Sequence, residues 1–152
     1  MGGEERQAIV GYVVAVITIL AAVALWMRWS NQEVEFCHRV LGDLVHGRQA
    51  AQRSIDWEHL KAMGVDVGAA YALLPDDKAR AKYRETFIKG FAEGFRRING
   101  QMSAFAHWRI YKRETDSTIV ATDDTRHKKT LLFTIPATGA KQIEGIQWER
   151  AG

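Results

Sequence analysis

The sequence has few of the residues and motifs on which most enzyme chemistry depends. Its 152 residues include one cysteine, Cys37, which excludes an intramolecular disulfide and a zinc site made of four cysteines. It contains no glycine-rich phosphate loop, nucleophile elbow or zinc-protease helix. We therefore expect no cofactor, no metal ion and no catalytic activity. Cys37 itself is expected to be a small apolar residue in a helix interface, with a disulfide between two chains as the alternative.

Charge of one sign is not concentrated either. The chain has 21 Lys and Arg residues against 18 Asp and Glu residues, which gives a formal net charge of +3 at pH 7. This mildly basic balance suits a soluble domain and weakly favours anionic surfaces. It lacks the concentrated basic patch typical of nucleic-acid binding, so we expect no nucleic-acid partner.

What the sequence does contain is a long apolar run at residues 8–27, without a single charged side chain. Twenty helical residues, each rising about 1.5 Å, span roughly 30 Å, the thickness of the hydrocarbon core of a bilayer. The run therefore predicts a transmembrane helix over residues 8–29, in contact with membrane lipids, behind a short tail of residues 1–7. Four residues are expected at the membrane interface, which aromatic rings and long cations favour: Tyr12, Trp26, Arg28 and Trp29.

A cleaved signal peptide is the alternative, with Ala22-Val23-Ala24 as its cleavage site. The segment before the run is not net basic, and the run is longer than the ~7–15 residues usual in such signals, so a single-pass anchor is favoured. The predicted orientation of this helix in the membrane depends on only a few arginine residues. Arg6 precedes the helix and three arginines follow it within about twenty residues, which favours a cytoplasmic domain.

Residues 30–152 are expected to form one α+β domain, helical over 30–100 and made of antiparallel strands over 101–149. Its first apolar stripe has spacings of three and four, which is typical of one helix face: Val34, Cys37, Leu41 and Leu44. We expect this stripe to pack on the domain's own sheet. The alternative is a coiled-coil dimer continuing from the membrane helix, and a homo-oligomer or a membrane-protein complex is the expected assembly.

Residues that cap or end helices predict three further helices. Asp56 is expected to begin a short helix over 57–63 that Gly64 ends, and Asp66 to begin another over 67–74. Asp76 should begin the longest soluble helix, 77–98.

This longest helix has the clearest apolar periodicity in the chain, and that stripe includes Gly90 and Gly94. Because each glycine lowers helix stability by about 1 kcal/mol relative to alanine, we interpret them as sites where a neighbouring element approaches closely. The opposite face is basic. It is expected to be solvated, with an acidic partner or anionic headgroups as the functional alternative: Lys78, Arg80, Lys82, Arg84, Lys89, Arg96 and Arg97.

After Gly100 the apolar period changes to two, which indicates strands over 104–112, 118–122, 130–135 and 141–149. In the last strand Ile143 and Ile146 have opposite parity. Gly145 lies between them, which indicates a β-bulge that turns both side chains inward. Helices followed by an antiparallel meander indicate an α+β domain.

Two parts of the domain resemble a known family. The passage Ser54-Ile55-Asp56-Trp57-Glu58-His59-Leu60 is similar to the "small residue, Asp-Trp, acid, x, Leu" passage of the ketosteroid-isomerase-like superfamily, also named after nuclear transport factor two. Residues 131–135 and 141–148 resemble its final hairpin. Over roughly residues 34–149, the resemblance implies helices folded on a curved sheet, forming a cone with an apolar pocket.

The superfamily includes isomerases, dehydratases, carrier modules and non-catalytic membrane-anchored assembly proteins. One of the last kind, an inner-membrane component of type IV secretion, has this layout of one helix and then one domain. No pocket Asp or Asp–His pair of the family's enzymes can be placed in this sequence. The resemblance therefore implies a non-enzymatic domain acting in protein–protein assembly, or as a scaffold, at the cell envelope. It favours a domain outside the cytoplasm, and we prefer that side.

The alternative function is a small-ligand-binding or weakly enzymatic cone. Its candidate pocket is His107, Arg109 and Tyr111, which strand alternation places with Phe105 on the face opposite Trp108. Asp123, Asp124 and His127 lie in one hairpin loop and could contact a cation, but we expect that loop to be solvated.

Overall fold

The computed structural model describes residues 2–150, and within them the chain forms two compact units. The first ends at Glu33 and the second begins at Val34. Helix α1, Gly3–Val45, contributes to both. Because α1 begins at Gly3, most of the stretch expected to be a tail is helical.

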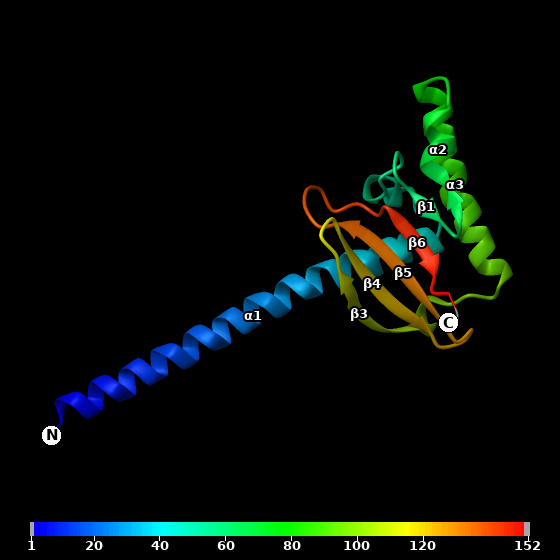
Figure 1. Ribbon diagram of the computed structural model, residues 1–152. Helices are drawn as coiled ribbons and strands as arrows, with labels where there is room; N and C mark the ends of the chain where they lie inside the picture. The colour runs from blue at the N-terminus through cyan, green and yellow to red at the C-terminus, as the bar shows by residue number, and fades with distance from the viewer. Residues whose placement is uncertain (1, 151–152) are drawn as a thin grey trace. The chain divides into compact units, whose positions relative to one another are not determined.

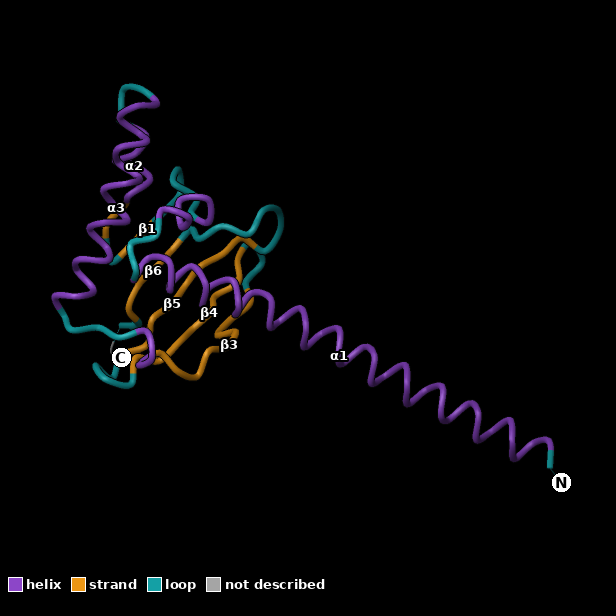
Figure 2. The backbone as a smooth tube through the Cα atoms, turned by 180° about the vertical axis from the view of Figure 1, so that it is seen from behind, coloured by secondary structure: helices purple, strands orange, loops and turns teal. Residues whose placement is uncertain are grey.

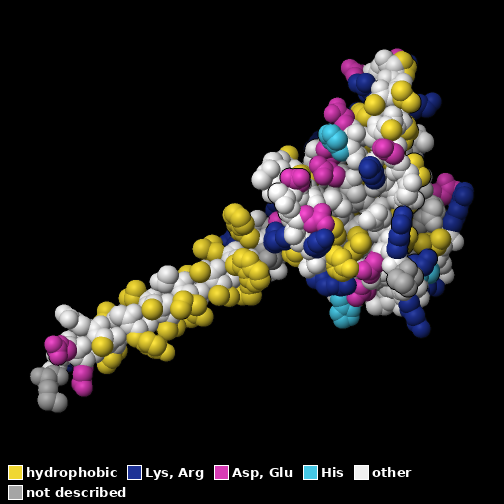
Figure 3. All heavy atoms as spheres, in the orientation of Figure 1, with side chains coloured by type: hydrophobic (Ala, Val, Ile, Leu, Met, Phe, Trp, Pro, Cys, Tyr) yellow, Lys and Arg dark blue, Asp and Glu magenta, His cyan; other side chains and the backbone are white. Residues whose placement is uncertain are grey.

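The first unit is the N-terminal part of α1 (Figure 3). Among residues 2–150, α1 is the one helix long and apolar enough to cross a membrane, and none of its most apolar stretch is buried by protein. The interface aromatics are open as well, with Tyr12 73%, Trp26 68% and Trp29 74% exposed. The Thr18 hydroxyl donates to the Val14 carbonyl at 2.8 Å, so the chain itself provides a partner for this polar group.

The second unit contains a six-stranded sheet of order β2-β1-β6-β5-β4-β3 (Figure 1). Four strands form the expected antiparallel meander: β3 Phe105–Arg113, β4 Ser117–Asp124, β5 Lys129–Pro136 and β6 Gly145–Trp148. β1, Lys61–Ala62, extends this sheet by pairing parallel with β6, and β2, Val65–Asp66, pairs antiparallel with β1. The predicted α+β class is confirmed.

The β1–β2 hairpin lies where a helix over 57–63 was predicted, and that prediction is wrong. Ala62 pairs with Val65, which leaves Met63 and Gly64 as a two-residue turn. Both have positive φ, 51° and 83°, the geometry that two-residue hairpins need to match strand twist. Gly64 therefore belongs to a hairpin turn and not to a helix C-terminus.

The other two predicted helices begin at their predicted capping residues. α2, Val67–Ala72, and α3, Asp77–Arg97, begin as predicted, because the carboxylates of Asp66 and Asp76 accept the backbone N–H groups of Ala69 and Ala79. Two short 3₁₀ helices, η1 Gln49–Ser54 and η2 Met102–Ala104, complete the unit. α2 and α3 run side by side, in contact through the rings of Tyr71 and Tyr83 (Figures 1 and 2).

The first apolar stripe packs inside its own domain. Cys37, Leu41 and Leu44 are fully buried in the core with Phe133 and Ile146, and Val34 packs against this core at its edge. The expected packing is confirmed. These buried side chains are therefore not available to a coiled-coil partner.

The bulge predicted at the last strand is confirmed. Gly145 is the register partner of Thr134, and the N–H of Glu144 also donates to the Thr134 carbonyl at 2.8 Å. Two residues of one strand thus oppose one residue of the other, which is the definition of a bulge. As a result Ile143 and Ile146 are both fully buried despite their opposite parity.

The packing explanation for the glycines of α3 is wrong. A Cβ built on Gly90 or Gly94 meets nothing within 4 Å, and both residues are exposed. Gly68 shows what a packed glycine looks like in this fold, because a Cβ there would lie 2.3 Å from the Glu58 carbonyl oxygen. Within residues 2–150, therefore, no close neighbour requires a glycine at position 90 or 94.

We expect Gly90→Ala and Gly94→Ala each to raise the free energy of unfolding by about 1 kcal/mol, through helix propensity alone. Gly68→Ala should lower it, because the Glu58 backbone must move. Denaturant unfolding of the full chain in detergent, followed by circular dichroism, measures all three. Destabilisation by Gly90→Ala or Gly94→Ala would show that a close neighbour does cover α3.

Candidate functional site

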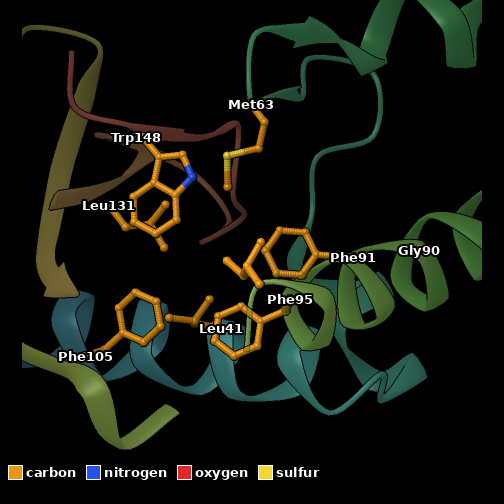
Figure 4. Close-up of a pocket in the computed structure, with 10 residues that line it drawn as sticks. Leu41, Met63, Gly90, Phe91, Phe95, Phe105, Leu131 and Trp148 are labelled. Atoms are coloured by element: carbon orange, nitrogen blue, oxygen red, sulfur yellow. The ribbon is translucent and has the colours of Figure 1, made fainter. Parts of the chain in front are cut away.

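An apolar cavity of about 290 Å³ lies between α3 and the sheet (Figure 4). Its lining comes from α1, the β1–β2 turn, α3 and the chain just after it, β3, β5 and β6. The lining consists of Leu41, Met63, Gly90, Phe91, Gly94, Phe95, Ile98, Phe105, Leu131 and Trp148.

Buried side chains form the inner wall of this cavity. Leu41 and Leu131 are at most 1% exposed, and Phe95 and Phe105 are 8% and 7% exposed. The Phe105 ring stacks on Phe95 at 5.9 Å and on Trp148 at 6.5 Å between centroids, so an aromatic wall crosses from α3 to β6. Such offset contacts hold the rings in place and keep the wall continuous.

The outer part of the cavity is open to solvent. Met63 from the β1–β2 turn is 42% exposed and Ile98 is 47% exposed. Gly90 and Gly94, one helical turn apart on α3, border the cavity without a side chain to fill it. An apolar group from outside can therefore reach the aromatic wall past the backbone of α3.

The cavity lining has no ionisable side chain, so it offers binding without acid–base or nucleophilic chemistry. The Nζ of Lys129 lies 5.8 Å from the ring centroid of Trp148, one of the lining residues. A second hollow, of about 960 Å³, has a mixed polar and apolar lining that includes His46, Lys89, Glu93 and Arg96. It is a broad surface depression beside α3.

The candidate pocket at His107, Arg109 and Tyr111 is not part of either hollow. His107 has a φ of 55°, and the β3–β4 register shifts between Ala106 and Arg109. This irregularity changes the alternation of β3, so Phe105 is buried and Trp108 also packs against the core. The expected separation of Phe105 from Trp108 onto opposite faces is therefore wrong.

Each of the three side chains has a local environment instead. His107 is exposed, and its carbonyl accepts a hydrogen bond from Arg109, which also forms an ion pair with Asp123 at 3.2 Å. The Tyr111 hydroxyl donates to the Glu149 carboxylate at 2.7 Å, and this bond, together with the charge of Glu149, raises the pKa of Tyr111. These contacts hold β3 to its neighbours.

The hairpin loop with the two aspartates is only partly solvated. Asp124 is 2% exposed and accepts the N–H groups of Arg126 and His127, with His127 Nδ1 also 2.7 Å from its carboxylate. His127 Nε2 lies 3.1 Å from the Ile98 carbonyl oxygen, which connects this loop to the end of α3. The cluster thus has a structural role, and the expectation of a solvated loop is wrong for Asp124.

The basic face of α3 is largely committed to contacts within the chain. Lys89 and Arg97 form ion pairs with Glu85 and Glu93, both at 2.6 Å. Arg84 donates to Gln52 and to the Tyr71 hydroxyl, and the Arg80 guanidinium lies over the Tyr71 ring. Lys78, Lys82 and Arg96 remain exposed. The face therefore presents scattered charges, which weakens its case as a surface for anionic headgroups.

The passage that carries the family resemblance is mainly structural. Trp57 is 7% exposed and Leu60 is fully buried, and the Trp57 indole donates to the Gln52 carbonyl at 3.0 Å. Asp56 accepts the N–H of Glu58, and its carboxylate lies 2.8 Å from His59 Nδ1. This hydrogen bond, followed by the charge of Asp56, raises the pKa of the exposed His59.

Among residues 2–150, no group of three or more His, Cys, Asp or Glu side chains is placed to hold a metal ion. Comparisons with models of known families, with characterised proteins and with solved structures found no match. The cavity is therefore the feature of the structure from which we infer a function. Sequence reasoning did not find this site, and its only local signal was the pair of glycines on the apolar stripe of α3.

We expect Asp56→Asn to lower the pKa of His59 towards its ordinary value, because the carboxylate that holds its proton is removed. A raised pKa means that this pair stabilises the fold below the ordinary pKa of histidine, and that the effect is lost as pH rises through the folded value. A proton NMR titration of the imidazole measures it. Glu58→Gln removes a neighbouring charge without that hydrogen bond and should cause a smaller change. Equal shifts in both variants would contradict the assignment.

Proposed function

We propose that the chain is a single-pass membrane protein whose anchored domain binds a small apolar ligand in the cavity between α3 and the sheet, without catalysing a reaction on it. The observation that carries this proposal is a cavity of about 290 Å³ with apolar side chains, glycines and no ionisable group. That volume is close to the lower end, about 300 Å³, of small-molecule pockets.

Two physical arguments support binding at this place. An engineered apolar cavity of about 150 Å³ is already enough to bind benzene, so the present volume suits a larger apolar group. The aromatic wall of Phe95, Phe105 and Trp148 offers a large apolar surface that a ligand would remove from water. The family resemblance, with its apolar pocket inside a cone, is consistent with the same assignment.

The anchor fixes where such binding would take place. The apolar part of α1 would hold the domain at a membrane, in contact with lipids through residues 8–29. We place the domain outside the cytoplasm, on the resemblance to anchored assembly proteins. Labelling of intact cells with an impermeant maleimide would show on which side of the membrane the domain lies.

Methionine methyl groups provide the test, because Met63 borders the cavity and Met102 lies in the second hollow. In the full chain in nanodiscs, with methionine methyls labelled with carbon-13, titration with 1-octanol should shift the Met63 signal saturably and leave Met102 unchanged. Gly94→Leu should abolish the Met63 shift, because a leucine side chain would occupy the open space beside α3.

Ala81→Leu is the matched control, since it adds the same side chain to an exposed site of α3 outside the cavity. It should keep the Met63 response. A Met63 signal that does not move, or that moves without saturation in both variants, would overturn the proposed binding site.

Assembly with other proteins is the second candidate function. It is favoured by apolar side chains that the domain leaves uncovered near the α2–α3 hairpin, where Leu73 is 86% and Val65 60% exposed. Leu73 directly follows α2 and Val65 lies in β2, so both large apolar side chains are open to a partner.

Light scattering of the full chain in detergent should therefore give a mass of more than one chain, and Leu73→Ser with Val65→Ser should reduce it to one. Thermal unfolding should barely change, because neither side chain is buried. A single-chain mass without any substitution, or an unchanged mass in the double variant, would contradict self-assembly through this surface.

A further inference from the structure

We infer that the ligand is an anionic amphiphile, with one hydrocarbon chain in the cavity and its negatively charged group on Lys129. This inference rests on the binding function proposed above and adds the chemical class of the ligand. Lys129 connects the two parts, because its ammonium lies over the ring of Trp148 while that ring lines the cavity.

The position of Lys129 leaves its charge available. It is the first residue of β5, it is exposed, and among residues 2–150 no carboxylate lies within 4 Å of its ammonium. Asp124 is its register partner in β4. That carboxylate is already occupied by two backbone N–H groups and by His127.

The surroundings favour a negative ligand over a neutral or positive one. Arg126 and Lys128 lie in the same hairpin, and no acidic side chain lines the cavity. Glu149, which follows Trp148, accepts a hydrogen bond from Tyr111 at 2.7 Å. An anion above Trp148 would therefore meet the ammonium of Lys129 without having to displace a carboxylate from it.

The size of the cavity sets the length of the chain. A water-sized group such as a methylene takes up about 30 Å³. The cavity of about 290 Å³ therefore has room for roughly eight to ten methylene groups. This fits a single medium-length alkyl chain. Both a free fatty acid and an anionic phospholipid of the adjacent bilayer present this chemistry, an alkyl chain beside a negative charge.

The experiment compares octanoate with 1-octanol by the carbon-13 signal of Met63, using the full chain in nanodiscs of zwitterionic lipid. Octanoate should bind more tightly than octanol. Lys129→Gln should weaken octanoate about fivefold or more and leave octanol unchanged, because only the carboxylate meets the ammonium. Lys128→Gln, which removes the same charge from the neighbouring position, should weaken octanoate less than Lys129→Gln does and leave octanol unchanged.

Each outcome decides a separate point. Saturable binding of both probes with equal affinity, unaffected by Lys129→Gln, would overturn the inference and leave the proposed function standing. Equal weakening of octanoate by both lysine variants would also overturn it, since it would show only a general charge effect. If neither probe shifts the carbon-13 signal of Met63, the proposed function itself is contradicted. When binding is confirmed, competition by phosphatidylglycerol in the nanodisc identifies a lipid source, and its absence identifies a free carboxylate.

Discussion

The fold of residues 34–150 depends on how α3 is attached to it, in the first half of the helix and at its end. At the midpoint of α3, the rings of Phe87 and Trp57 meet edge to face at 5.3 Å, and nearer its start Tyr83 packs on Tyr71. At its end, the Ile98 carbonyl lies 3.1 Å from the ring of His127 in the β4–β5 hairpin. Between these attachments Gly90 and Gly94 carry no side chain towards a neighbour. Ile88 and Phe95 are buried on one side of this stretch, and the cavity lies beside the two glycines.

Two irregularities in the sheet complete the opposite wall. In β3, the positive φ of His107 and the register shift beside it accompany the burial of Phe105 and the inward packing of Trp108. Before β6, the extra residue opposite Thr134 lets both Ile143 and Ile146 enter the core. A sheet with regular alternation would turn one member of each pair towards solvent.

Features that depend on local sequence could be predicted, and those that depend on tertiary placement could not. The caps at Asp66 and Asp76 and the bulge beside Gly145 follow from residues a few positions apart, and all were found. Gly64 was misassigned because a glycine after an apolar stretch is equally typical of a helix end and of a hairpin turn. Apart from the two glycines of α3, the cavity gave no local pattern, because it joins Met63 to Trp148 and Leu41 to Phe95 across most of the domain.

The cost of the open cavity is the strongest argument that something fills it. Gly90 and Gly94 together reduce helix stability by about 2 kcal/mol relative to alanine, and no contact inside the chain explains them. Met63 and Ile98 leave further apolar surface in water beside them. A ligand present at about a hundred times its dissociation constant would stabilise the folded state by about 2.7 kcal/mol, which is similar to the cost of the glycines. Binding an apolar chain at this place, as proposed, would account for all of these features.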